Sequence, residues 1–230
     1  MYLTRFQINR KRPGAYKFLG SPQVMHAAVL GGFPDPSPRE SGRILWRIDS
    51  WEGKTFLYIV SPEQPDLTHL VEQIGWPTTQ SWETKPYGEL LSRIQEGEQW
   101  AFRLTANPTR SIPHRGVEQQ RGKVSAHVTA DQQKQWLLDK AEKSGFELLR
   151  PAHPASWETD PQSVVLSDRR TLKFKRQGAE VTIATVTYDG ALQVTDRDAF
   201  VNSLTWGIGR AKGYGCGLLT IAPLNLGKAS

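Results

Sequence analysis

The sequence predicts an α+β protein made of two successive domains, each with the element order β-α-β-β-α-β and an antiparallel sheet. The chain has 230 residues, a length that favours two small domains over one. Its first half alternates short strand-like and helix-like segments in that order, and its second half repeats the order. Because this is the order of the split β-α-β unit, we expect two tandem ferredoxin-like, RRM-like domains, at residues 1–90 and 96–230.

In the first half, alternating apolar and polar residues predict strands, and a capped apolar segment predicts the first helix. Ser21 is a good N-cap and Pro22 is favoured at the first helical position, so this helix is expected to begin there. The stretch 75–98 is rich in Pro, Thr and Gly and is the expected linker. The expected elements are strands at residues 2–8, 43–49, 55–60 and from Trp82, and helices at residues 21–30 and 66–74.

The second half shows the same alternation, interrupted by a loop expected at residues 107–122. A hairpin is predicted where Gln177 and Gly178 separate two strand-like runs. The tryptophans of these patterns are expected in the core: Trp46, Trp51, Trp100, Trp136 and Trp206. The expected elements are strands at residues 99–106, 146–149, 163–175, 181–194 and 218–224, and helices at residues 131–144 and 196–204.

Composition narrows the class of protein. The net charge is +6, and the 29 lysines and arginines are divided almost evenly between the two halves, which favours a polyanionic partner bound by the fold itself. No apolar run approaches the roughly 18 residues of a membrane helix, and no signal-peptide core precedes the first strand, so we expect a soluble protein that is not exported. The single cysteine, Cys216, excludes an internal disulfide framework and a cysteine-based zinc site, and fits a reducing cytosol.

Residues 206–219 place five glycines and two cations in fourteen residues. Glycine lets backbone amides approach a phosphate closely, and Arg210 and Lys212 add positive charge. A P-loop is excluded because no Gly-Lys-Ser/Thr occurs, and a Rossmann fingerprint fits poorly because the order here is helix, loop, strand. The alternative is a tight helix-to-strand connection with spare glycines. The glycines are Gly207, Gly209, Gly213, Gly215 and Gly217.

Histidine chemistry centres on His26. The five histidines show no metal-ligand spacing, and no tight acidic cluster suggests a two-metal site, so no metal or other cofactor is expected. A catalytic Cys/His pair would have to use Cys216 as its nucleophile, and Cys216 is instead expected to be a small packed residue of the glycine-rich segment. His26 falls in the second turn of its helix and shares a face with Gln23, near the positive end of the helix dipole, which attracts phosphate. The alternative is a partly buried histidine bonded to a carbonyl. The packed face of the helix is expected to be Val24, Ala27, Ala28 and Gly31.

A basic strand supplies candidate contacts to a polyanion. Lys173 and Lys175 share one face, with Leu172 and Phe174 on the other. The alternative is a solvated edge strand protected by lysines. The candidates in this strand are Arg169, Arg170, Lys173, Lys175 and Arg176, and those of second rank are Arg110, Arg115, Arg121 and Lys123.

Residues 207–219, followed by Ala222-Pro223-Leu224, closely resemble the C-terminal glycine-rich loop of the CasE family. These are the CRISPR RNA-processing endoribonucleases of type I-E Cascade, in the RAMP superfamily. The resemblance extends to Met1-Tyr2-Leu3-Thr4-Arg5, to residues 21–26 and to residues 102–108, in the family's order and spacing. It implies two tandem ferredoxin-like domains in a cytoplasmic prokaryotic protein that is a monomer when isolated. The implied partners are CRISPR repeat hairpin RNA, its crRNA product and other Cascade subunits.

The chemistry that this resemblance implies is metal-independent cleavage of RNA. The ribose 2′-hydroxyl attacks the adjacent phosphate and leaves a 2′,3′-cyclic phosphate and a 5′-hydroxyl, with His26 as general acid or base. The basic strand and its partner would enter the groove of an RNA stem, as basic hairpins in this family do.

The chain departs from the family pattern at two positions. Gln23 stands where members often carry tyrosine, and it can hydrogen-bond but cannot exchange a proton; Tyr16 and Lys17 are the candidates for a substitute. Arg210 stands where proline is common. One alternative function is therefore an RNA-binding structural subunit that cleaves weakly or not at all. Another is a small-molecule phosphate-binding enzyme, against which the cations of the basic strand argue.

Overall fold

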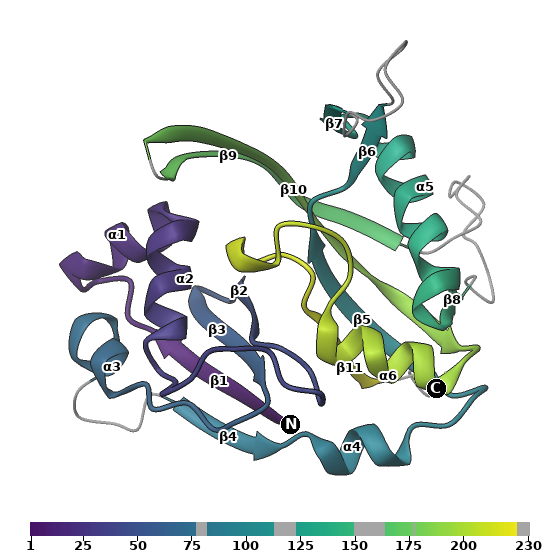
Figure 1. Cartoon of the computed structure of the whole chain (residues 1–230), viewed down its shortest axis with the longest axis horizontal. Helices are drawn as coiled ribbons and strands as arrows, with labels where there is room; N and C mark the ends of the chain where they lie inside the picture. Colours follow the sequence, from purple (N-terminus) through teal and green to yellow (C-terminus); the bar gives the residue numbers. More distant parts are fainter. Residues whose placement is uncertain (77–81, 113–122, 150–163, 177, 225–230) are drawn as a thin grey trace.

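The computed structural model describes residues 1–76, 82–112, 123–149, 164–176 and 178–224. Within these residues two large antiparallel sheets lie side by side, and helices cover each of them (Figure 1). The arrangement confirms the predicted α+β class with two ferredoxin-like units. No helix in the described part of the chain is long and apolar enough to cross a membrane.

The first sheet has the strand order β2-β3-β1-β4. Its apolar alternation turns Phe6, Leu57 and Ile59 toward the helices, where all three are fully buried. The elements are β1 (Tyr2–Ile8), α1 (Pro13–Gly20), α2 (Pro22–Leu30), β2 (Leu45–Trp51), β3 (Lys54–Ser61), α3 (Thr68–Ile74) and β4 (Trp82–Pro86). Because β2 is an edge strand, it is available to meet the second half of the chain.

The second sheet repeats the topology with the strand order β11-β5-β10-β8. Phe146 lies at the centre of its core, with ring centroids 6.2 Å from Phe102 and 5.9 Å from Phe200. Its elements are β5 (Gln99–Ala106), α5 (Ala130–Ala141), β8 (Phe146–Leu148), β9 (Val164–Arg176), β10 (Ala179–Val194), α6 (Arg197–Trp206) and β11 (Leu219–Pro223). Strands β8 and β9 pair one after the other along β10.

Several elements were not predicted. Helix α1 follows a run of cations that resembles a loop, but Pro13 begins the helix and Ala15 and Phe18 bury its inner face. Helix α4 (Gly88–Arg93) lies within the expected linker and buries Leu91. The prediction of a loop at 107–122 is wrong for β6 (Thr109–Ile112), which pairs with β7 (Lys123–Ala126). Two short 3₁₀ turns, η1 (Glu142–Ser144) and η2 (Lys212–Tyr214), complete the described elements.

Strands β9 and β10 form a long hairpin that bends where it leaves the sheet. Thr185 pairs with Arg170 but Thr187 pairs with Ser167, so two residues of β9 oppose one of β10. This β-bulge contains Asp168, whose φ of +49° is rare for a residue other than glycine. Beyond the bulge, residues 170–176 and 178–185 form an arm that curves over α1 and α2 (Figure 1).

Arg47 joins the two sheets. Its side chain is almost fully buried, and Nε and Nη2 each donate to the Asp49 carboxylate at 2.8 Å. Nη1 donates to the carbonyls of Arg103 and Leu218 at 2.9 Å, and Nη2 also donates to Thr220 Oγ1 at 2.8 Å. The planar guanidinium thus connects edge strand β2 with β5 and β11, a geometry that lysine could not reproduce.

Replacing Arg47 by methionine should lower the free energy of unfolding by about 3–5 kcal/mol. The Asp49 carboxylate loses its closest partner and keeps only Arg103 at 3.9 Å, and the carbonyl of Leu218 loses its bond to Arg47. Denaturant unfolding of the purified protein measures the loss. Arg5→Met is the matched control, since Arg5 pairs with Glu83 at 3.5 Å with both side chains half exposed, and its loss should stay within about 1 kcal/mol. Equal small losses in the two variants would contradict the role given to Arg47.

Candidate active site

His26 lies in the second turn of α2, and the start of that helix is fixed by its cap. The Ser21 hydroxyl accepts a hydrogen bond from the Val24 amide at 3.4 Å, and Pro22 occupies the first turn. Met25 and Val29 are both fully buried and anchor the helix in the core of the first sheet. His26 follows Met25, so its half-buried side chain projects sideways from the packed face.

The expected packed face of α2 is wrong in part. Met25 and Val29 are its fully buried residues, and Val24 and Ala28 are half buried against the same core, as expected. Ala27 and Gly31, in contrast, are exposed.

The indole of Trp46 on β2 holds the imidazole. Trp46 is 3% exposed, and its Nε1–H donates to Nδ1 of His26 at 3.3 Å. Trp46 was expected to be a core residue, and it is one, together with Trp136. The same expectation is wrong for Trp51, which is 68% exposed where β2 ends, while Trp100 and Trp206 are half buried.

The glycine loop, residues 207–217, closes over both rings. A Cβ at Gly213 would lie 3.1 Å from Nε2 of His26, and one at Gly215 would lie 2.9 Å from the Trp46 ring. Elsewhere in the loop, Gly209 gives the same room to the Trp136 ring. These glycines let the loop pack directly against large side chains. That is a more specific role than the one expected of spare glycines in a helix-to-strand turn. The approach of the loop to a phosphate stays a prediction.

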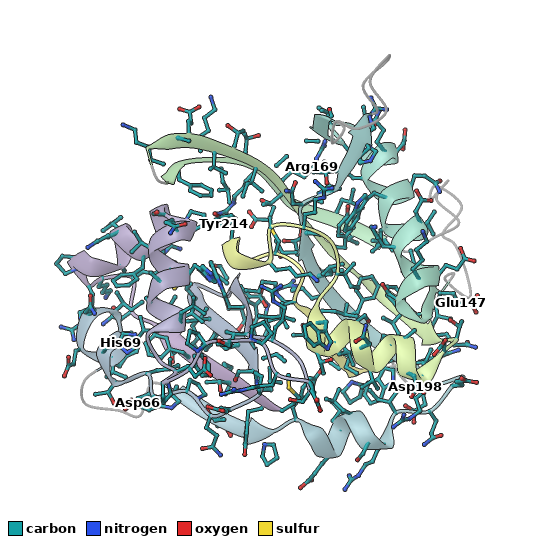
Figure 2. The ribbon with its side chains drawn as sticks, in the orientation of Figure 1. Asp66, His69, Glu147, Arg169, Asp198 and Tyr214 are labelled. Carbon is teal, nitrogen blue, oxygen red and sulfur yellow. The ribbon has the colours of Figure 1, made fainter. Side chains whose placement is uncertain are left out.

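Tyr214 connects the glycine loop with the arm. Its ring centroid lies 6.4 Å from that of His26 in an edge-on arrangement and 4.7 Å from that of Phe174 on β9. Figure 2 shows Tyr214 in the space between α2 and the arm. The expected substitutes lie elsewhere: Tyr16 is 80% exposed on α1, and Lys17 is exposed beside it. Gln23 is half buried in the first turn of α2.

Two cations stand close to the loop without a carboxylate partner among the described residues. Lys212 is half buried; burial, and then the nearby Arg43 guanidinium, lower the pKa of its ammonium group. The Nε of Arg43 is buried without a hydrogen-bond partner. Like charges held together in this way favour an anion, because a bound anion removes their repulsion. Arg210, in contrast, is exposed.

A cleft of about 520 Å³ is lined by residues of both domains. Trp46 and Tyr214, the two rings that contact His26, line it, and so does Arg103 on β5. Arg10 from the segment after β1 and Arg170 from the arm also reach it.

The basic strand has two different faces. Lys173 and Lys175 are exposed on one face, while Phe174 is 8% exposed on the other, as predicted. Arg170 faces the cleft and forms an ion pair with Asp168, and Arg169 donates to the carbonyl of Val128. Arg110 is exposed on β6. Arg115 and Arg121 lie outside the described residues, as do the side chains of Lys123 and Arg176.

The remaining candidates for chemistry are accounted for by packing. Cys216 is fully buried, and burial raises the pKa of its thiol to about 12, so it is not poised as a nucleophile. His69 Nε2 contacts the carbonyl of Ala28 at 2.9 Å, a structural bond between α3 and α2. In the described ranges, no three His, Cys, Asp or Glu residues are grouped so that they could hold a metal ion.

Comparison with known proteins places the chain in a family. A family model described as CRISPR associated protein matches residues 1–223. The chain belongs to that family. Among its relatives, the CRISPR-associated endoribonuclease Cse3 of Thermus thermophilus is 27% identical over 225 residues, which cover 97% of this chain and 100% of Cse3. The CRISPR system Cascade subunit CasE of Escherichia coli is 30% identical over 132 residues, which cover 57% of this chain and 62% of CasE.

The fold of this CRISPR-associated protein is also similar to that of a solved structure. T. thermophilus Cse3, bound to an RNA that represents a pre-cleavage complex, matches with a TM-score of 0.78 and 25% identity over 96% of this chain and 98% of Cse3. These findings confirm the resemblance to the CasE family.

Sequence reasoning missed two neighbours in the site. The bond from Trp46 to His26 crosses 20 residues of sequence, and Arg43 approaches Lys212 from the other domain. No local pattern signals either, because both contacts depend on how β2 docks beside the glycine loop.

Gly215→Ala should destabilise the protein more than the matched variant Gly53→Ala. Both glycines have positive φ, +79° and +74°, but only Gly215 touches another side chain, that of Trp46. We expect about 1–2 kcal/mol for Gly53→Ala from the backbone alone. Overpacking against Trp46 should add about 1–3 kcal/mol. Denaturant unfolding measures both, and equal losses would mean that the ring contact contributes nothing.

Proposed function

We propose that this chain cleaves the hairpin of CRISPR repeat RNA to mature crRNA, without a metal ion, and retains the product as a Cascade subunit. The observation that carries the proposal is the site itself. His26 is held by Trp46 and by Gly213 of the glycine loop, and the preceding residue of that loop, Lys212, lies near the Arg43 guanidinium. Support comes from the match to Cse3, a relative named as an endoribonuclease, along its whole length. The proposed reaction occurs in the cytoplasm of a prokaryotic cell, where CRISPR RNA is made.

The reaction uses a nucleophile of the substrate. The ribose 2′-oxygen attacks the adjacent phosphorus, the bond from phosphorus to the 5′-oxygen breaks, and a 2′,3′-cyclic phosphate and a 5′-hydroxyl remain. The protein has to hold the attacking and leaving oxygens in line and stabilise the negative charge that grows on the phosphate. Lys212 and Arg43 supply positive charge, and His26 takes part in the proton chemistry as general acid or base.

The arm is suited to the RNA stem. Lys173 and Lys175 form its exposed cationic face, and the phosphates of an A-form stem are the polyanion that such a face recognises. Phe174 on the opposite face rests on Tyr214, which lies beside His26. Binding of the stem by the arm thus takes place at a fixed position relative to the cleavage site.

The first test is cleavage of the host's CRISPR repeat RNA in EDTA. The wild type should cut at the base of the stem and leave cyclic-phosphate ends, while His26→Ala should lose cleavage but keep RNA affinity. His69→Ala removes a half-buried histidine outside the site and should retain cleavage. Tight binding without cleavage by the wild type would favour the non-cleaving structural subunit, and the absence of both would overturn the proposal.

Neutralising the arm should change the salt dependence of RNA binding. Lys173→Gln and Lys175→Gln should each lower the slope of log affinity against log salt by about one unit, because each removes one phosphate contact. Lys143→Gln, an exposed lysine on η1, should leave the slope unchanged. Filter binding of uncleaved repeat RNA at several salt concentrations measures the slopes. Equal slopes for the arm variants and the wild type would show that the arm faces solvent in the complex.

A further inference from the structure

One face of the first sheet carries aromatic and cationic side chains that the proposed cleavage site does not use. Side chains alternate along a strand, and Trp46 on β2 and Leu57 and Ile59 on β3 belong to the core under the helices. Trp51, at the end of β2, and Phe56, on β3, therefore lie on the opposite face of the sheet.

Trp51 is 68% exposed at the tip of the β2–β3 hairpin. Glu52 and Gly53 form its two-residue turn with φ of +49° and +74°, a combination that fits the twist of a hairpin and holds Trp51 opposite Lys54. A Cβ at Gly53 would meet no atom within 4 Å beyond its neighbours in the chain, so the tip projects into open space. Within the described residues, neither Trp51 nor Lys54 has a ring contact or an ion pair.

Phe56 and Tyr58 continue the aromatic surface along β3. Both rings are half buried, and their centroids are 6.4 Å apart. The half-exposed Arg5 guanidinium on β1 lies 5.5 Å from the Phe56 centroid. Tyr58 packs against the core of the second domain, which covers that end of the face, whereas Trp51 at the other end is exposed.

We infer that this platform, made of Trp51, Lys54, Phe56 and Arg5, binds the single-stranded RNA beyond the scissile bond, with one base stacked on Trp51. The identity of the RNA rests on the proposed function. Every base has a face that can stack on an aromatic ring, and nearby cations neutralise the phosphates, so aromatic residues mixed with cations recognise single-stranded nucleic acid. The first domain has the strand order β2-β3-β1-β4, and RRM domains stack bases on aromatic residues of such a four-stranded sheet.

Charge favours RNA at this end of the sheet. Strand β1 ends opposite the first residues of β3, so the cations that follow it, Arg10 and Lys11, leave the sheet beside the hairpin. Both are exposed, as is Lys54, and Glu52 in the turn is the opposing charge. A protein that covered Trp51 by apolar contact would have to bury these cations, whereas RNA phosphates would neutralise them.

The cleft connects the platform with the cleavage site. Ser50 and Thr55, whose hydroxyls are 3.2 Å apart, are the neighbours of the Trp51–Lys54 pair and line the cleft together with Trp46. Trp46 bonds to His26 and is five residues before Trp51 on β2, about 17 Å away at the rise of a strand. RNA that continues from the scissile bond through the cleft therefore arrives at Trp51.

The test measures how much a single-stranded flank adds to RNA affinity. Two RNAs carry the repeat hairpin with 2′-deoxy nucleotides at the base of the stem, which removes the attacking hydroxyl, and only one of them continues beyond that point. The wild type should bind the flanked RNA at least roughly 5-fold more tightly. Trp51→Ala should reduce this gain by roughly 5- to 30-fold, the lower part of the range for one stacked base, and should bind the bare hairpin as the wild type does.

The matched control is Trp76→Ala. Trp76 is 38% exposed and follows α3, which packs on the other face of the sheet, so its loss should leave the gain unchanged. Trp51→Phe keeps an aromatic ring and should keep most of the gain. Lys54→Gln should lower the slope of log affinity against log salt by about one unit for the flanked RNA only.

Photocrosslinking gives the second measurement. 5-Iodouridine in the flank should crosslink to Trp51, as mass spectrometry of the digested protein would report. No gain from the flank, or an equal gain in the wild type and Trp51→Ala, would overturn the inference and leave Trp51 to a protein partner. Failure of the wild type to cleave repeat RNA would overturn the proposed cleavage alone, because the flank is measured on uncleaved RNA; absence of binding to either RNA would overturn both.

Discussion

The buried guanidinium of Arg47 is the interaction on which the candidate site depends. The site is composite: His26 and Trp46 belong to the first domain, whereas the glycine loop and the arm belong to the second. Arg47 bonds to the carbonyl of Leu218, at the end of that loop, and lies next to Trp46 in sequence. It therefore fixes the spacing between the strand that bears Trp46 and the loop that covers it. Its own charge is balanced by Asp49, which makes its burial tolerable.

The glycine loop illustrates how one sequence feature can have a structural and a chemical explanation at once. Its glycines allow backbone to lie directly on rings from both domains, and the amide of Gly217 donates to the carbonyl of Thr105 at 2.7 Å. The same close packing leaves Lys212 half buried near His26. A loop of larger residues could supply the charge, but it would hold the rings apart. The structure therefore directly supports one physical reason for these glycines, which is the positioning of the rings that they contact.

Much of the fold could be predicted because local patterns encode it. Strand β1 follows from alternation, α2 from its cap at Ser21, and the two faces of the arm from the spacing of Lys173 and Lys175. Helix α1 was missed because its helical signal is short and follows a run of cations. The packed face of α2 was misjudged because the pattern of small residues does not say where the sheet lies. The partners of His26 were beyond prediction for the same reason, since Trp46 and Tyr214 reach it only when distant strands and loops dock.

The bend at Asp168 has a consequence for the whole arm. Its unusual backbone conformation and the register shift beside it set the angle at which the arm leaves the sheet before any RNA arrives. The contact of Phe174 with Tyr214 then fixes the height of the arm above the imidazole. The exposed lysines are thereby set at a defined distance from His26. In the proposed enzyme, that distance would select the scissile bond by its separation from the stem groove, with no need to recognise the bases beside it.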